Sequence, residues 1–154
     1  MKSKYLKALF NPSYAAYLLA KKYQRYYEGF SYEFKKNGEE DLLDRLNQEE
    51  IKTIFDVGAN KGEWSEIARK KFKNAEIHTF EISRKNYELL SEKHIIDTNV
   101  VLNNFGLSNS NGNFLYKDYG AGSGVNTLIT NANYHDKTIK PESKSAYVCK
   151  NDDY

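Results

Sequence analysis

The sequence predicts an α/β domain built on a partial doubly wound parallel sheet, preceded by a helical N-terminal extension. Three apolar segments with strand character, residues 51–57, 75–80 and 99–105, are separated by two helical patterns, residues 64–72 and the segment after Ser83. Strands that alternate with helices of this length require parallel pairing with helical crossovers. The chain of 154 residues has room for one such domain. We place that domain at residues 51–154, after a helical segment at residues 1–50.

The N-terminal segment contains two helical patterns. Asn11 and Pro12 form a good helix start, because Asn caps the first turn and Pro fits there without losing a hydrogen bond. A second helix is predicted over residues 39–47. The first helix is basic and carries a face rich in tyrosine and leucine. This face could rest on an anionic membrane surface or cover an edge of the sheet. We favour the second interpretation, since tyrosine buries less well in a membrane than leucine or phenylalanine.

The composition narrows the classes of function. A net charge of +2 gives no reason to expect a nucleic-acid partner. The single cysteine, Cys149, excludes an intrachain disulfide and favours a reducing compartment. No apolar run approaches the roughly 20 residues of a membrane span, so we expect a cytoplasmic protein. The three histidines lack metal-ligand spacing with Cys149, so no metal site is predicted. His78 lies within a predicted strand and is expected to be a packed core residue.

The C-terminal part of the chain changes in character. Asn111 and Gly112 lie between two extended stretches, which is the strongest short-range signal for a β-hairpin. The stretch "YGAGSGVNTL" follows as a glycine-rich loop, and a short strand is predicted over residues 146–149.

The stretch "FDVGANKGEWS" indicates a ligand-binding turn, because ligands of open α/β sheets sit at the carboxyl ends of the strands. Gly58 and Gly62 permit a tight turn and close approach of a ligand. The dinucleotide fingerprint G-x-G-x-x-G is absent, and Asp56 beside the glycines would repel a pyrophosphate. The acid favours a ligand with positive charge and no phosphate, such as S-adenosylmethionine. Glu81, at the end of the second predicted strand, is placed to accept hydrogen bonds from ribose hydroxyls.

Three stretches, "FDVGANKGEWS", "HTFEIS" and "NNFGLSNSNGNF", resemble in order and spacing the FkbM-type S-adenosylmethionine-dependent methyltransferases. The resemblance covers residues 51–154 and implies a Rossmann-like class I methyltransferase fold. It implies a methionine and sulfonium site formed by Asp56, Gly58, Asn60 and Gly62. It also implies that Glu81 holds the ribose, that Ile82 and Asn104 lie on the adenine side, and that Ser123 and Thr127 lie near the substrate.

The activity implied by the resemblance is O-methylation of a hydroxyl group on a glycan or small metabolite, with S-adenosylmethionine as cofactor. No general base is identified: Asp118 and His135 are available, and each is interpreted as an ordinary loop residue. Where the family has Pro after the ribose-binding acid, this chain has Ile82.

The family's next motif, an acidic strand end followed by Glu-Gly, has no counterpart among residues 1–154. We therefore expect a chain that lacks the C-terminal half of the family fold. Its first strand would keep one open edge, through which the chain could self-associate. Two alternatives stay open: a non-catalytic truncated remnant or cofactor-binding partner subunit, and a nicotinamide nucleotide-binding domain. Asp56 and the G-x-x-x-G spacing argue against the nicotinamide alternative.

Overall fold

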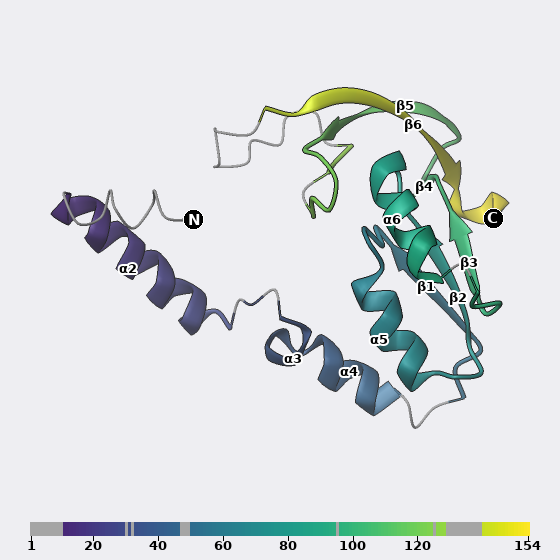
Figure 1. Ribbon diagram of the computed structural model, residues 1–154, viewed down its shortest axis with the longest axis horizontal. Helices are drawn as coiled ribbons and strands as arrows, with labels where there is room; N and C mark the ends of the chain where they lie inside the picture. Colours follow the sequence, from purple (N-terminus) through teal and green to yellow (C-terminus); the bar gives the residue numbers. More distant parts are fainter. Residues whose placement is uncertain are drawn as a thin grey trace. The chain divides into compact units, whose positions relative to one another are not determined.

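The computed structural model describes residues 11–29, 31, 33–46, 50–94, 96–124, 126–128 and 140–154. The chain is of the α/β class and divides into two compact units, Met1–Arg45 and Leu46–Tyr154 (Figure 1). Each unit is described by itself.

The first unit is helical. Helix α2 (Pro12–Tyr27) begins as predicted, because the Asn11 side chain accepts a hydrogen bond from the Tyr14 backbone N–H at 3.0 Å and Pro12 occupies the first turn. Two shorter helices follow, α3 (Phe34–Asn37) and α4 (Glu39–Leu46). Helix α4 confirms the predicted second helix up to Leu46; residue 47 lies outside the described residues.

The second unit begins with a three-stranded parallel sheet in the order β1-β2-β3, formed by β1 (Thr53–Val57), β2 (Glu76–Phe80) and β3 (Val100–Asn103). Helices α5 (Glu63–Lys71) and α6 (Arg84–His94) connect consecutive strands and pack against β2 and β3 (Figure 1). The predicted alternation of parallel strands and helices is therefore confirmed, with strands slightly shorter than the apolar runs.

The two faces of this sheet differ. Asp56 bonds to Ser65 of α5, so the face that carries Asp56 and its register partner Thr79 is the one that α5 covers. Thr79 and Ile77 are fully buried there.

The other face carries an aromatic cluster of Phe55, His78, Phe80 and Tyr154, whose ring centroids lie 4.9–5.7 Å apart. The sequence predicted that His78 is a packed core residue, but in the structure it is only half-buried. Its ring nitrogens contact the Tyr154 hydroxyl at 2.5 Å and the Glu76 carboxylate at 2.8 Å.

Strand β1 lies at the end of the parallel sheet, and within the described residues no strand pairs with its outer edge. Phe55 and Val57 on this strand are 51% and 59% exposed. This arrangement agrees with the expected open edge.

The predicted hairpin is wrong, because this part of the chain forms a second sheet of three strands. It is formed by β4 (Gly106–Ser108), β5 (Gly112–Asp118) and β6 (Glu142–Lys150), in the order β4-β6-β5. Strand β6 lies between the two strands that were expected to pair, parallel to β4 and antiparallel to β5.

Asn111-Gly112 is therefore not a hairpin turn. The Asn111 side chain instead binds the end of β6 and the residues after it. The Asn111 Oδ1 atom accepts the Lys150 N–H at 2.6 Å, and the Asn111 Nδ2 atom donates to the Asp153 carboxylate at 2.5 Å. Strand β6 is also longer than the predicted strand at residues 146–149, since all seven residues of β5 pair with it.

Candidate ligand-binding site

The turn between β1 and α5 has an unusual backbone. Gly58, Asn60 and Gly62 have φ angles of 87°, 52° and 77°, and Asn60 is the only non-glycine residue with positive φ in the described part of the chain. At Gly62 a side chain would also collide with α6, since an added Cβ would lie 2.5 Å from the Leu90 Cδ1 atom. Glycine adopts positive φ without strain, whereas Asn60 is strained there. Such strained residues are retained where surrounding contacts hold them, and they cluster at ligand sites.

Hydrogen bonds tie this turn to the end of β2. The N–H groups of Gly58 and Ala59 both donate to the Phe80 carbonyl oxygen, at 2.8 and 3.0 Å. The Asn60 N–H donates to the Glu81 Oε2 atom at 2.8 Å, and the Ser83 N–H donates to Oε1 at 2.7 Å. One carboxylate thus joins the turn after β1 to the segment that leads into α6.

The Glu81 carboxyl group is in an environment that disfavours its charge. Burial raises its pKa, and the neighbouring charges of Asp118 and Asp56 raise it further, although the two backbone N–H bonds act in the opposite direction. The side chain is only 5% exposed. A ligand that donates hydrogen bonds or carries positive charge would stabilise the ionised form.

A pocket of about 260 Å³ opens beside this carboxylate. Its lining comes from the ends of β1 and β2, from the start of β4 and from the glycine-rich loop after β5: Val57, Gly58, Asn60, Phe80, Glu81, Ile82, Gly106, Leu107, Ser123, Gly124 and Asn126. Its volume approaches the lower end of the usual range for ligand sites, about 300 Å³.

The structure brings five of the predicted site residues together at this pocket. These are Gly58, Asn60, Glu81, Ile82 and Ser123.

The other four predicted residues lie next to the pocket lining or support it. Asp56 accepts a hydrogen bond from the Ser65 hydroxyl at 2.5 Å, and Gly62 packs against α6. The Asn104 amide donates to the Glu81 carbonyl oxygen at 2.8 Å. Thr127 forms a backbone bridge to Lys117, with N–O distances of 2.9 and 3.2 Å.

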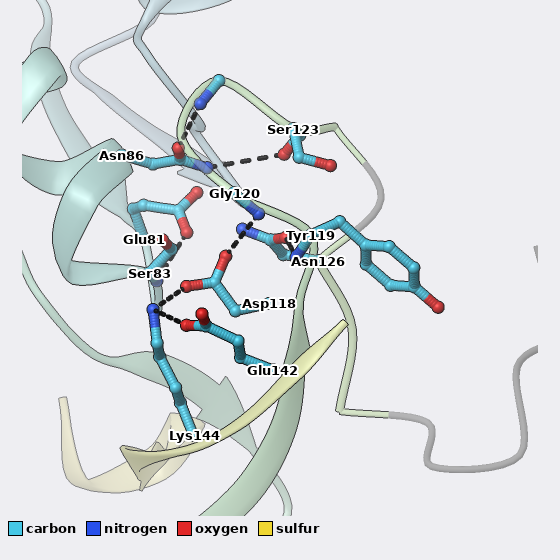
Figure 2. A network of polar contacts seen from close by, with 11 residues as sticks. Glu81, Ser83, Asn86, Asp118, Tyr119, Gly120, Ser123, Asn126, Glu142 and Lys144 are labelled. Atoms are coloured by element: carbon cyan, nitrogen blue, oxygen red, sulfur yellow. Dashed lines mark hydrogen bonds and ion pairs between the residues drawn. The ribbon is translucent and has the colours of Figure 1, made fainter. Parts of the chain in front are cut away.

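Asp118 is not the ordinary loop residue that the sequence suggested. It is the last residue of β5, it is 3% exposed, and it forms an ion pair with Lys144 of β6 (Figure 2). Burial raises the pKa of the Asp118 carboxyl, but the hydrogen bonds from Lys144 and from the Gly120 N–H outweigh burial and lower it overall. A paired carboxylate with a lowered pKa is a poor general base. His135 lies outside the described residues.

The residue that holds the glycine-rich loop is one that the sequence did not predict. Asn86 reaches from α6 to this loop, where its Oδ1 atom accepts the Gly122 N–H at 2.7 Å and its Nδ2 atom donates to the Ser123 carbonyl oxygen at 3.4 Å (Figure 2). Asn86 lies among charged residues in "RKNYELLSEK", which reads as a solvated helix face, yet it is 1% exposed. No local signal separates it from a surface asparagine.

Comparison of the chain with protein-family models, with curated proteins and with solved structures finds no match. Among the described residues, no helix combines the length and the apolar character that crossing a bilayer requires.

Proposed function

We propose that the second unit is a Rossmann-like S-adenosylmethionine-binding domain of the FkbM methyltransferase type, which acts on a hydroxyl of a glycan or small metabolite. One observation carries the proposal. The turn with positive φ at Gly58 and Asn60 and the Glu81 carboxylate meet at a single pocket at the carboxyl ends of two adjacent parallel strands. This is where open α/β sheets bind ligands.

The residues at the pocket fit this cofactor. Each Glu81 oxygen accepts one backbone hydrogen bond and keeps further acceptor capacity for a ribose hydroxyl. Ile82, Phe80 and Leu107 provide an apolar surface suited to a nucleobase. No lysine or arginine lies in the described lining of the pocket, which favours this cofactor over a dinucleotide with its pyrophosphate.

When bound, S-adenosylmethionine supplies an electrophilic methyl group for in-line transfer to an acceptor oxygen. The contribution of the chain is binding and alignment: the glycine turn permits close approach, and Glu81 orients the ribose through a carboxylate that two backbone N–H groups hold in place. The described residues supply no side chain to which we assign the acceptor proton.

The test is binding of S-adenosylhomocysteine to the full chain by calorimetry. Glu81→Ala is expected to weaken binding by about 1–3 kcal/mol, the usual cost of removing a hydrogen bond to a charged group. Glu76→Ala is the matched control, since Glu76 lies on β2, the strand that Glu81 directly follows, and its side chain is 54% exposed. Equal affinity in the wild type and Glu81→Ala would place the ligand elsewhere, and preference for NAD would favour the nicotinamide alternative.

A second candidate function is that of a cofactor-binding subunit that completes its sheet with another chain. The observation that favours it is the outer edge of β1, which no strand covers within the described residues, beside the exposed Phe55 and Val57 on one face of the same strand. Apolar open edges promote strand pairing between chains. Light scattering over a concentration series tests this candidate, because Phe55→Lys should reduce self-association, whereas a concentration-independent monomer would argue against it.

A further inference from the structure

The glycine-rich loop after β5 forms one wall of the pocket. It contributes Ser123, Gly124 and Asn126 to the lining. Gly124 lies close to the β1–α5 turn, since a Cβ placed on it would lie 3.9 Å from the Asn60 Nδ2 atom. A ligand in the pocket therefore lies between the glycine turn on one side and this loop on the other.

The side-chain amide of Asn126 has a defined orientation in this wall. Its Oδ1 atom accepts the Tyr119 backbone N–H at 2.8 Å (Figure 2), which assigns the oxygen and the nitrogen of the amide. Its Nδ2 atom is shielded from solvent and has no hydrogen-bond partner within the described residues. A buried donor without an acceptor is costly, so a ligand that offers an acceptor at this position would be favoured.

The loop that carries Asn126 is held before any ligand arrives. Asn86 binds the backbone at Gly122 and Ser123, and the Asp118 carboxylate accepts the Gly120 N–H at 2.8 Å. Lys144 in turn pairs with Asp118 (Figure 2). These contacts come from helix α6, which packs against β3 of the parallel sheet, and from strands β5 and β6 of the second sheet. A preorganised donor of this kind loses little conformational freedom on binding.

We propose that Asn126 is a specificity-determining residue of the pocket, whose Nδ2–H donates to an acceptor atom of the adenosine part of the ligand. The inference rests on the proposed function, because the adenosine part is what Ile82 and Leu107 in the same lining would contact. The preferred ligand class is a nucleoside with a neutral acceptor, either a ring nitrogen or a ribose oxygen.

The test is the variant Asn126→Asp, measured by calorimetry with S-adenosylhomocysteine and with adenosine as probes. Asp keeps an oxygen for the Tyr119 N–H and has nearly the same shape, but it replaces the donor by an acceptor. We expect the affinity for both probes to fall about ten- to a hundred-fold. The control Asn99→Asp changes an amide whose Nδ2 atom contacts the Lys73 carbonyl oxygen, away from the pocket, and should leave both affinities unchanged.

The outcomes separate the two proposals. If the wild type binds S-adenosylhomocysteine and Asn126→Asp binds it equally well, the role of Asn126 is refuted while the proposed function stands. If the wild type binds neither probe, the proposed function fails and the inference with it. Should Asn126→Asp not fold, the ¹⁵N resonance of the Asn126 side-chain amide in the wild type decides. A shift of this resonance on addition of S-adenosylhomocysteine supports the contact, and an unchanged resonance overturns it.

Discussion

Replacing Glu81 by glutamine probes the carboxylate that joins the β1–α5 turn to the segment that leads into α6. Both carboxylate oxygens accept a backbone hydrogen bond, from Asn60 at 2.8 Å and from Ser83 at 2.7 Å. Glutamine has one acceptor oxygen, so its amide group must face one of the two N–H groups. An unpaired buried donor costs about 1–3 kcal/mol. At a pH low enough to protonate Glu81 in the wild type, we expect Glu81→Gln to lower the free energy of unfolding by about 1–3 kcal/mol.

The pH dependence of this difference follows from the raised pKa of Glu81. The folded protein holds the Glu81 proton more tightly than the unfolded chain does. The stability of the wild type therefore falls as the pH rises from the ordinary glutamate pKa of 4.5 through the raised pKa of Glu81. Glutamine does not titrate. The gap between wild type and Glu81→Gln should therefore narrow as the pH rises.

Urea unfolding of both proteins over a pH series measures this gap. The control is Glu76→Gln, which removes a charge from an exposed side chain on β2, the strand that Glu81 directly follows. A gap that widens with pH would refute the raised pKa. Equal stability of the wild type and Glu81→Gln at every pH would refute the two backbone hydrogen bonds.

Three further substitutions test separate contacts. Gly62→Ala places a Cβ 2.5 Å from the Leu90 Cδ1 atom at a φ of 77°, so the free energy of unfolding measured in urea should fall by about 2 kcal/mol or more; an unchanged value would contradict the turn geometry. Asn86→Ala removes two hydrogen bonds to the glycine-rich loop, so amide exchange at residues 120–124 should accelerate and S-adenosylhomocysteine should bind about tenfold more weakly, whereas unchanged exchange would argue against the anchor. Burial raises the pKa of Asp97, but the hydrogen bonds from the Asn99 N–H and the Arg69 side chain outweigh burial and lower this pKa overall. The stability that ionised Asp97 contributes is therefore present above its ordinary pKa of 3.8 and is lost as the pH falls through the lowered pKa. Asp97→Asn should lack this loss in acid unfolding curves and cost about 0.5 kcal/mol at pH 7, and an acid response like that of the wild type would assign the loss to another group.

The features that the sequence determines by itself are local. The Asn11-Pro12 helix start depends on residues within one helical turn, since the Asn11 side chain caps the backbone three residues ahead. The parallel strands β1 to β3 follow from apolar runs alternating with helical patterns, which leave few other ways to bury those runs. The tight turn between β1 and α5 was also predictable, because Gly58 and Gly62 stand where the backbone requires positive φ.

Only the tertiary structure decides the second sheet and the loop that closes the pocket. The local signal at Asn111-Gly112 favours a hairpin, but β6 enters from more than 20 residues beyond β5 and pairs with all of that strand, which outweighs the turn propensity. Asn86 and Asn126 gain their roles in the same way. Each binds backbone that the fold brings beside it: Asn86, on a helix face that looks solvated in the sequence, holds the glycine-rich loop, and Asn126 lines the pocket.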